Sequence, residues 1–503
     1  MSTGKVWLVG AGPGDPGLFT VKGREILQNA EVVVYDSLVG QGVLSQIPKE
    51  AKAINVGKRA SHHTMPQEKI NQVLVEEAKK GYRVVRLKGG DPFLFGRGGE
   101  ELELLTKEQI PYEVVPGVTS PIAVPAYNGI PVTHRDYTSS LHIITGHKRQ
   151  GEAYDIDFKA LVDTKGTLVF LMGVTALPDI CASLLEAGMD PQMPAAVLQK
   201  GTTAGQKRIV STVVELPEEV KRQGVETPAI IVVGKVCALA EEFAWYENLP
   251  LAGYKVLVTR PKDLISTMSA KLRTLGAEVL ELPAIRTEPL EDQRELHQAF
   301  NELDTYDWAA FTSPTGVKIF FEELLKTGTD IRKLGGIRIA AIGKGTEKAL
   351  KERGLIPDLI PEIYDGASLG KALREACCGE ERILIPRAKI GNHEILEELE
   401  KKTGLRISDI ATYDTFYENQ EIIDEKKEFE QGGIDCAVFT SASTVRGFAA
   451  ACPDLDYTKV TAACIGKQTK AAADSYGMKT YMAEKATIDS VLELVIRLKE
   501  KEC

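Results

Sequence analysis

Several features that commonly indicate a function are missing from this chain of 503 residues. Its eight cysteines form no C-x-x-C pair and no metal-ligand spacing with the histidines, so we expect no metal site and a reducing compartment. A formal net charge of −10 lacks the basic footprint of a general nucleic-acid binder. No apolar run approaches the ~20 residues that span a bilayer, and no secretory signal is apparent. We therefore expect a cytoplasmic protein that binds neither nucleic acid nor membrane.

The first glycine-rich loop lacks one glycine. The stretch "VWLVGAGPGDPGLFT" (6–20) runs from an apolar strand into a turn, as a dinucleotide-binding loop does. Gly10 and Gly12 fit that pattern, but Asp15 stands where the third glycine belongs. A carboxylate there would repel the pyrophosphate that a helix N-terminus attracts. The loop predicts either a ligand without phosphate or a tight turn with no ligand, and it argues against a nicotinamide cofactor.

Apolar strands alternate with amphipathic helical segments along the whole chain. Strand-like runs such as "EVVVYD", "TLVFLMG" and "AIIVVGKV" contrast with helical stretches such as "MPQEKINQVLVEEAKKG". This alternation predicts an α/β protein whose sheets are parallel and covered on both faces. The pattern breaks at "WYENLPLAGYKVLVTRP", and we place a domain boundary at residues 245–253.

The part of the chain after this boundary repeats itself. Three pairs of segments match: 255–261 with 382–388, 307–324 with 435–452, and 340–354 with 463–477. A period of this length is that of a domain, so we expect two similar α/β lobes. A cleft between such lobes would suit a small molecule, and the alternative is a duplicated scaffold without chemistry.

The first half carries polar, glycine-rich motifs at the ends of its predicted strands. In order they read "VGAGPGDPGLFTVKG", "YDSLV", "VGKRASHH", "RLKGGDPFLFGRGGEE", "VPGVTS" and "GIPVTHR". These motifs closely resemble uroporphyrinogen-III C-methyltransferases of the tetrapyrrole methylase family, over residues 1–245. The resemblance implies two methyl transfers from S-adenosylmethionine to uroporphyrinogen III, at C-2 and C-7. The products would be S-adenosylhomocysteine and precorrin-2, an intermediate for sirohaem or cobalamin.

The same resemblance implies roles for individual residues. Asp36 would accept a proton and Lys58 would donate one; alternatively, Asp36 orients the substrate and Lys58 binds a carboxylate. The methyl donor would contact Pro13, Gly89, Gly90, Asp91, Leu94, Thr119, Ser120, Met172 and Gly201, although the family often has alanine at position 120. The polycarboxylate acceptor would meet counter-charges from Arg59, Arg97, His134 and Arg135. We expect sub-domains of about 1–115 and 116–245, and a homodimer formed through this half.

The repeated lobes of residues 254–503 resemble uroporphyrinogen-III synthase. The matching segments are "VLVTRP", two "FTS" turns, two "IGK-x-T" turns and "ATYDT" (411–415). The resemblance implies cyclisation of hydroxymethylbilane, with one lobe of 254–282 plus 418–503 and another of 289–405. Tyr413 is our candidate for assisting departure of the hydroxyl group. Candidate donors to substrate carboxylates, whose alternative role is helix capping, are Thr312, Ser313, Thr440, Ser441 and Ser443.

Two alternatives stay open. Within the methylase family the rivals are later cobalamin-pathway methylases and an rRNA ribose methylase, and the acidic charge balance disfavours the latter. The C-terminal half could instead be a non-catalytic module that binds a tetrapyrrole. We favour a bifunctional enzyme, a methyltransferase joined to a lyase, because the first half would consume what the second half makes.

Overall fold

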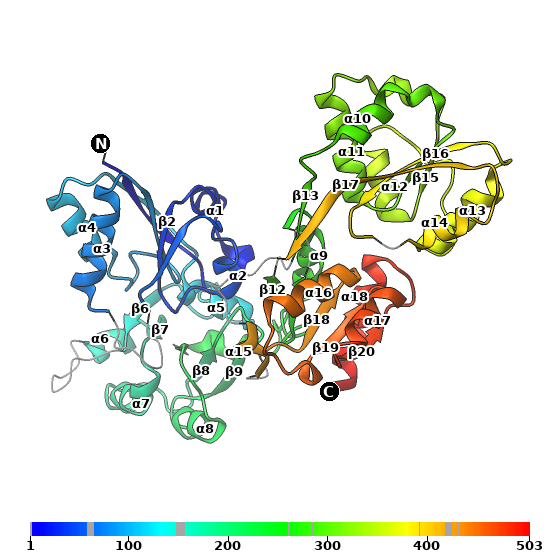
Figure 1. Cartoon of the computed structure of the whole chain (residues 1–503). Helices are drawn as coiled ribbons and strands as arrows, with labels where there is room; N and C mark the ends of the chain where they lie inside the picture. The colour runs from blue at the N-terminus through cyan, green and yellow to red at the C-terminus, as the bar shows by residue number, and fades with distance from the viewer. Residues whose placement is uncertain are drawn as a thin grey trace.

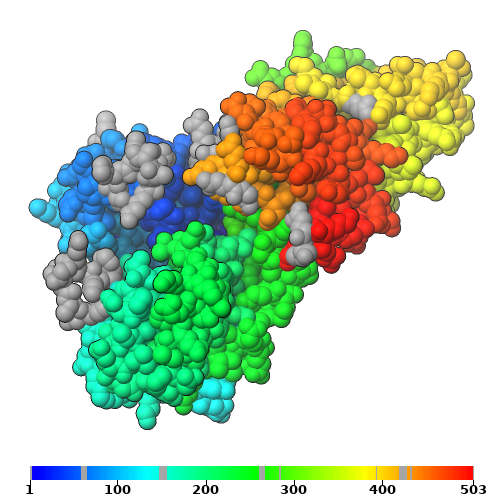
Figure 2. Space-filling view, turned by 90° about the horizontal axis from the view of Figure 1, so that it is seen from below, coloured from blue at the N-terminus to red at the C-terminus, as the bar shows by residue number. Residues whose placement is uncertain are grey.

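In the computed structural model, the chain folds into four five-stranded sheets, each covered by helices (Figure 1). The structure describes residues 3–57, 65–146, 156–259, 262–282, 285–391, 393–417, 425–430 and 433–502. The first two sheets lie together, and the orange and red lobe lies between them and the yellow lobe at the far end (Figure 2). Among the helices that the structure describes, none is long and apolar enough to cross a membrane.

The first sheet is entirely parallel, with strand order β3-β2-β4-β1-β5. Its strands are β1 (Lys5–Gly10), β2 (Val32–Tyr35), β3 (Lys52–Asn55), β4 (Arg83–Lys88) and β5 (Tyr112–Val115). Alternate residues of β1 pack on opposite faces: Val6 and Leu8 on one, Val9 on the other. The helices on the first face are α3 (Gln67–Lys79) and α4 (Gly98–Lys107), and those on the second are α1 (Val21–Gln28) and α2 (Gln41–Leu44). Because the strands share one direction, their following loops meet at one edge.

The second sheet is mixed, whereas the apolar runs predicted a parallel sheet. Its order is β6-β7-β10-β8-β9, and only β6 and β7 pair in parallel. The strands are β6 (Leu141–Thr145), β7 (Thr167–Leu171), β8 (Pro194–Gln199), β9 (Lys207–Thr212) and β10 (Ala229–Val233). The helices of this unit are α5 (Ser120–Tyr127), α6 (Phe158–Asp163), α7 (Leu177–Glu186) and α8 (Leu216–Gln223). The prediction of a parallel sheet was wrong here. A strand that is buried on both faces has the same apolar sequence whether it runs parallel or antiparallel to its neighbours.

The third sheet is parallel, with order β12-β11-β18-β19-β20. Its strands are β11 (Lys255–Thr259), β12 (Glu278–Leu282), β18 (Cys436–Phe439), β19 (Thr461–Cys464) and β20 (Lys479–Met482). Its helices are α9 (Lys262–Thr274), α15 (Glu425–Glu430), α16 (Ala442–Ala451), α17 (Lys467–Asp474) and α18 (Ile488–Glu502). The sheet therefore combines segments from the two ends of the C-terminal half.

The fourth sheet, with order β13-β17-β16-β14-β15, lies between those segments in the sequence. Its strands are β13 (Ile285–Pro289), β14 (Trp308–Phe311), β15 (Arg338–Ala341), β16 (Arg382–Ala388) and β17 (Arg406–Tyr417). Its helices are α10 (Arg294–Asn301), α11 (Pro314–Lys326), α12 (Lys344–Lys351), α13 (Gly366–Ala376) and α14 (Glu394–Leu399). Residues 285–289 pair antiparallel with residues 413–417, so this sheet extends beyond the predicted lobe of 289–405.

The repeated segments of the sequence occupy equivalent places in these two sheets. In the third sheet β11 pairs with β18, and β18 pairs with β19. In the fourth sheet β16 pairs with β14, and β14 pairs with β15, all in parallel. The internal repeat is therefore a repeated βαβα arrangement, and corresponding strand ends carry the two "FTS" turns.

Candidate functional site

Three loops cross at the carboxyl edge of the first sheet. Gly12 and Gly90 exchange backbone hydrogen bonds, N to O, of 3.2 and 2.7 Å. A Cβ atom on Gly10 would lie 2.5 Å from the Gly117 Cα atom and 2.6 Å from the Gly90 oxygen. The loops after β1, β4 and β5 thus touch backbone to backbone, which only glycine allows at these positions. This crossing brings together the first, fourth and fifth motifs that the sequence predicted to bind the donor.

Asp91 fixes the shape of this crossing. Its Oδ1 atom accepts hydrogen bonds from the Phe93 and Leu94 backbone N–H groups at 2.8 and 3.2 Å. Its Oδ2 atom accepts one from the Gly117 N–H at 3.0 Å, which ties the loop after β4 to the loop after β5. Beside it, Gly90 has φ +66°, and a Cβ there would meet no atom within 4 Å, so open space adjoins this glycine.

Asp15 explains the absent third glycine of the first loop. Its Oδ1 atom accepts a hydrogen bond from the Gly17 N–H at 2.7 Å, and its Oδ2 atom accepts one from the Tyr127 hydroxyl at 2.8 Å. Its own N–H donates to the Thr202 hydroxyl at 3.2 Å. Burial, and then the Asp15 charge, raise the pKa of Tyr127. The half-buried Pro13 precedes this anchor, which ties the first loop to the second sheet's unit.

Asp36 follows β2 and meets a buried charge cluster. Its Oδ1 atom accepts from the Leu38 N–H at 3.0 Å, and its Oδ2 atom lies 3.2 Å from the Arg86 guanidinium. Arg86 and Lys88 both contact Glu101 Oε1, at 3.0 and 2.9 Å, and Glu101 is fully buried. Burial, and then the Arg86 charge, lower the pKa of Lys88. This cluster was not predicted from the sequence, although charged residues inside the buried strand "RVVRLK" signal the need for partners.

Positive φ angles occur in loops of both sheets of the first half. Phe95 (52°) and Arg97 (57°) lie in the loop after β4, whereas Met172 (56°), Lys200 (44°) and Thr202 (68°) lie in loops after strands of the second sheet. Such conformations cost free energy and gather at functional sites, where the surrounding structure maintains them. Met172 directly follows β7, and 54% of its surface is exposed.

The other predicted residues of the first half lie on several separate loops and turns. Thr119 and Ser120 begin α5, and Gly201 packs so closely on α5 that a Cβ would lie 2.4 Å from Val124. A Cβ atom on Gly89 would lie 2.6 Å from the Leu38 side chain. Arg97 forms an exposed ion pair with Glu100 at 2.6 Å, and His134 and Arg135 lie in the turn before β6. Lys58 and Arg59 lie outside the described residues.

In the C-terminal half, two of the predicted serines cap helices. The Ser313 hydroxyl accepts from the Gly316 N–H at 2.9 Å at the start of α11. The Ser441 hydroxyl accepts from the Thr444 N–H at 3.2 Å at the start of α16, and it lies 2.9 Å from the Ser443 hydroxyl. Capping, the alternative role of these serines, is therefore present at both repeats. Thr312 and Thr440 each precede a cap, at the ends of β14 and β18.

Tyr413 lies on β17 and contacts one of the capping serines. Its hydroxyl is 2.8 Å from the Ser313 hydroxyl, and burial raises the pKa of Tyr413. On the adjacent strand, Arg387 donates to Asp409 at 2.7 Å. The Nη1 atom of Arg387 is buried without a hydrogen-bond partner in the part of the chain that the structure describes. Arg387 was not among the predicted residues, although it lies in the repeated segment "RILIPRA".

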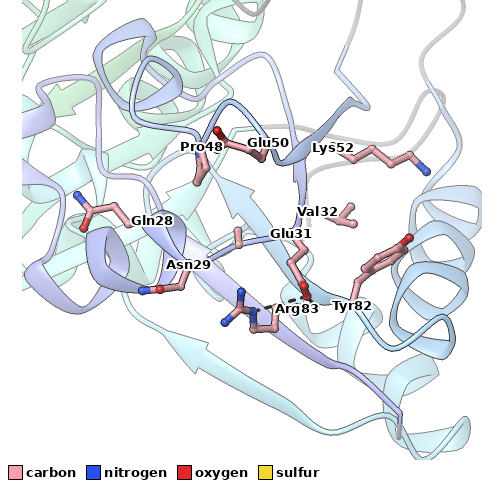
Figure 3. A pocket seen from close by; sticks show the side chains of 10 residues that line it. Gln28, Asn29, Glu31, Val32, Pro48, Glu50, Lys52, Tyr82 and Arg83 are labelled. Atoms are coloured by element: carbon pink, nitrogen blue, oxygen red, sulfur yellow. Dashed lines mark hydrogen bonds and ion pairs between the residues drawn. The ribbon is translucent and has the colours of Figure 1, made fainter. Parts of the chain in front are cut away.

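One hollow of the surface lies away from these sites. It is lined by Gln28, Glu31, Lys52, Tyr82 and Arg83, at the amino ends of β2 and β4 (Figure 3). Asp36 and the glycine crossing lie at the opposite, carboxyl edge of the same sheet, and no predicted site residue lines this hollow. Within the described ranges, no group of three or more histidine, cysteine, aspartate or glutamate side chains could hold a metal ion.

Comparisons with known proteins match both halves. The family model for tetrapyrrole (corrin/porphyrin) methylases matches residues 5–217, and that for uroporphyrinogen-III synthase HemD matches residues 266–493. A porphyrin biosynthesis protein HemD of Ruminiclostridium josui is 46% identical over 498 residues, 99% of each chain. A uroporphyrinogen-III C-methyltransferase of Bacillus subtilis is 39% identical, over 71% of this chain and 73% of its own. A siroheme synthase of Thioalkalivibrio sulfidiphilus is 47% identical, over 55% of each chain.

The buried charge cluster yields a prediction about stability. Glu101→Gln should lower the free energy of unfolding by about 3–5 kcal/mol. The variant leaves Arg86 and Lys88 buried, and Asp36 is then the only negative charge left in the cluster. Glu103→Gln, at an exposed position of the same helix, should change it by less than about 0.5 kcal/mol. Urea unfolding of the two variants and the wild type makes the comparison. Equal losses in both variants would mean that the cluster does not stabilise this unit.

Proposed function

We propose a function on the premise that the chain belongs to the family of porphyrin biosynthesis proteins that join a tetrapyrrole methylase to a uroporphyrinogen-III synthase. Residues 254–503 cyclise hydroxymethylbilane to uroporphyrinogen III. Residues 1–245 methylate this product at C-2 and C-7 with S-adenosylmethionine, which gives precorrin-2. The siroheme synthase relative supports sirohaem as one destination, and cobalamin is a second. The homodimer expected through the first half is part of this proposal.

The observation that carries the proposal is the succession of two family matches in one chain. As their names state, one family makes uroporphyrinogen III and a relative from the other methylates it. An end-to-end relative at 46% identity, over 99% of each chain, has nearly the same length and is named a porphyrin biosynthesis protein. A chain with both units can pass the product of one to the other without a second protein.

The loop crossing suits a methyl donor that carries no phosphate. The Asp15 carboxylate, which would repel a pyrophosphate, is turned toward Gly17 and Tyr127. The open space beside Gly90 lets a ligand approach the backbone closely. S-adenosylmethionine, when bound, supplies an electrophilic methyl group on a sulfonium. The residues that would hold it are Pro13, Gly89, Gly90, Asp91, Leu94, Thr119, Ser120, Met172 and Gly201.

The protein's part in methyl transfer is alignment and proton removal. An in-line displacement gains most from holding the acceptor carbon against the methyl group. Asp36 accepts the proton that the macrocycle loses, and Arg86 and the Leu38 N–H hold its two oxygen atoms in place. Lys58 supplies a proton, and Arg59, Arg97, His134 and Arg135 meet the substrate carboxylates.

In the C-terminal half, Tyr413 donates a hydrogen bond to the hydroxyl group that leaves hydroxymethylbilane. Its contact with Ser313 orients the phenol. Thr312, Thr440, Ser441 and Ser443 lie at the equivalent strand ends of the two lobes and bind further carboxylates.

The test of this proposal is a coupled assay on the whole chain. With hydroxymethylbilane and S-adenosylmethionine, mass spectrometry should detect a doubly methylated product; without the donor, uroporphyrinogen III should accumulate. Asp36→Asn should slow methylation at least about 100-fold and leave uroporphyrinogen III formation unchanged. Formation of only the non-inverted isomer would instead favour a C-terminal half that binds a tetrapyrrole without catalysis.

The role of Asp91 gives a prediction about donor affinity. Asp91→Ala removes the acceptor of three backbone N–H groups, so the binding of S-adenosylhomocysteine should weaken about tenfold or more. Asp190→Ala removes a similar turn contact, to the Gln192 N–H at 2.9 Å, outside the crossing and should leave affinity unchanged. Isothermal calorimetry measures both. Unchanged affinity in Asp91→Ala would remove this residue from the donor site.

The role of Tyr413 gives a prediction about the isomer ratio. Tyr413→Phe should slow formation of uroporphyrinogen III by about 10-fold, so that spontaneous closure to the non-inverted isomer competes. Tyr306→Phe is the matched control, because this tyrosine is also buried and its hydroxyl also makes a hydrogen bond with a serine, Ser408, at 3.0 Å. Chromatography of the two isomers gives the ratio. The same ratio in both variants would argue against Tyr413 as the group that assists the leaving hydroxyl.

A further inference from the structure

The third sheet makes a direct hydrogen bond to a loop of the N-terminal half. Glu278, the first residue of β12, accepts from the Ala204 N–H at 2.8 Å through its Oε2 atom. Ala204 lies between β8 and β9, three residues after Gly201, which is one of the proposed donor contacts. A carboxylate that accepts a backbone N–H forms a charge-assisted bond, stronger than a neutral one.

The loop that Glu278 contacts also packs against the first glycine-rich loop. The Thr202 hydroxyl accepts from the Asp15 N–H at 3.2 Å. A Cβ atom on Gly14 would lie 2.9 Å from the Thr203 side chain, so the two loops touch without spare room. Thr202 itself has φ +68°, a conformation that neighbouring contacts must maintain. Residues 201–206 therefore lie between the donor loop on one side and Glu278 on the other.

Glu278 is in turn held by a buried lysine. Lys255 Nζ lies 3.4 Å from Glu278 Oε1 and 2.8 Å from Glu428 Oε2, and its side chain is 10% exposed. Lys255 also donates to Gln41 Oε1 at 2.7 Å, and Gln41 donates to Glu428 at 2.7 Å. Gln41 begins α2, five residues after Asp36, and Figure 1 shows α2 beside β12. The ammonium group of Lys255 thus connects Gln41, which lies near Asp36 in the sequence, with Glu278, which accepts the hydrogen bond from Ala204.

We propose that Glu278, supported by Lys255, is a positioning residue for methyl transfer, although it belongs to the C-terminal half. The hydrogen bond from Ala204 keeps residues 201–206, and through them the donor loop, in the shape that binds the methyl donor. This inference rests on the proposed methyltransferase activity. It means that donor affinity in the first half depends on a side chain of the second.

The experiment compares variants of the whole chain by calorimetry with S-adenosylhomocysteine. Glu278→Ala should weaken binding about tenfold or more, the effect of one hydrogen bond to a charged group. Glu278→Gln keeps an oxygen that can accept from Ala204, and it should bind within about twofold of the wild type. Glu281→Ala is the matched control: Glu281 lies on the same strand, is equally exposed, and pairs with Arg273 at 2.8 Å within the C-terminal half. It should leave affinity unchanged.

A second measurement reports how stable the loop of residues 201–206 is in the absence of S-adenosylhomocysteine. Amide hydrogen exchange of a peptide covering residues 200–206 should be faster in Glu278→Ala than in the wild type and in Glu281→Ala. Uroporphyrinogen III formation should stay at the wild-type rate in every variant, which reports that the C-terminal half is folded. Should Glu278→Ala slow that reaction, Ala204→Pro removes the N–H donor from the other side and takes its place in the comparison.

The outcomes separate the two proposals. Unchanged affinity and unchanged exchange in Glu278→Ala, or unchanged affinity in Ala204→Pro, would overturn the role of Glu278. Failure of the wild type to bind S-adenosylhomocysteine would instead overturn the proposed methyltransferase activity. Weaker binding in Glu281→Ala to the same extent as in Glu278→Ala would show a general effect of charge loss on β12 and would also overturn the inference.

Discussion

The first half of this protein depends on the contact of three backbones at Gly10, Gly90 and Gly117. A side chain at Gly10 or Gly117 would overlap the backbone of the neighbouring loops, and Gly90 has φ +66°, a conformation that favours glycine. The crossing sets the places of Asp91, of the open space beside Gly90, and of the loop that ends in Asp15. A site of this kind is built from peptide groups, and its side chains serve mainly to hold those groups in place.

Two clusters of buried charges also hold the loops of the first half in place. Arg86, Lys88 and Glu101 form a cluster behind Asp36, and Lys255 forms another beneath the Ala204 loop. Burying such charges is costly unless they are paired, and their geometry is therefore well defined. Each cluster contacts a residue at the proposed methyl-transfer site: Arg86 contacts Asp36, and Lys255 contacts Glu278, which binds the Ala204 loop. The positions of these residues relative to the substrates matter for the reaction.

Local patterns predicted the α/β architecture, the repeated arrangement of the C-terminal half and the loops at strand ends. The pairing between Arg86 and Glu101 could not be predicted, because it joins a strand to a helix that follows it. The antiparallel strands of the second sheet could not be predicted either, since a fully buried strand shows no sign of its direction. Ser313 and Ser441 illustrate a third limit, because a serine that caps a helix and one that binds a ligand occupy the same strand-end position.

The insertion of the fourth sheet within the third has a consequence for how the chain folds. β11 pairs with β18, and the bond from the Lys255 N–H to Asp435 joins residues 180 positions apart. Pairing between such distant segments is slow, because the chain loses the entropy of closing the intervening loop before the contacts between the strands stabilise it. During synthesis, all the residues of the fourth sheet leave the ribosome before the residues of β18 do. We therefore expect the inserted lobe to fold first, and the lobe that touches the N-terminal half to be completed last.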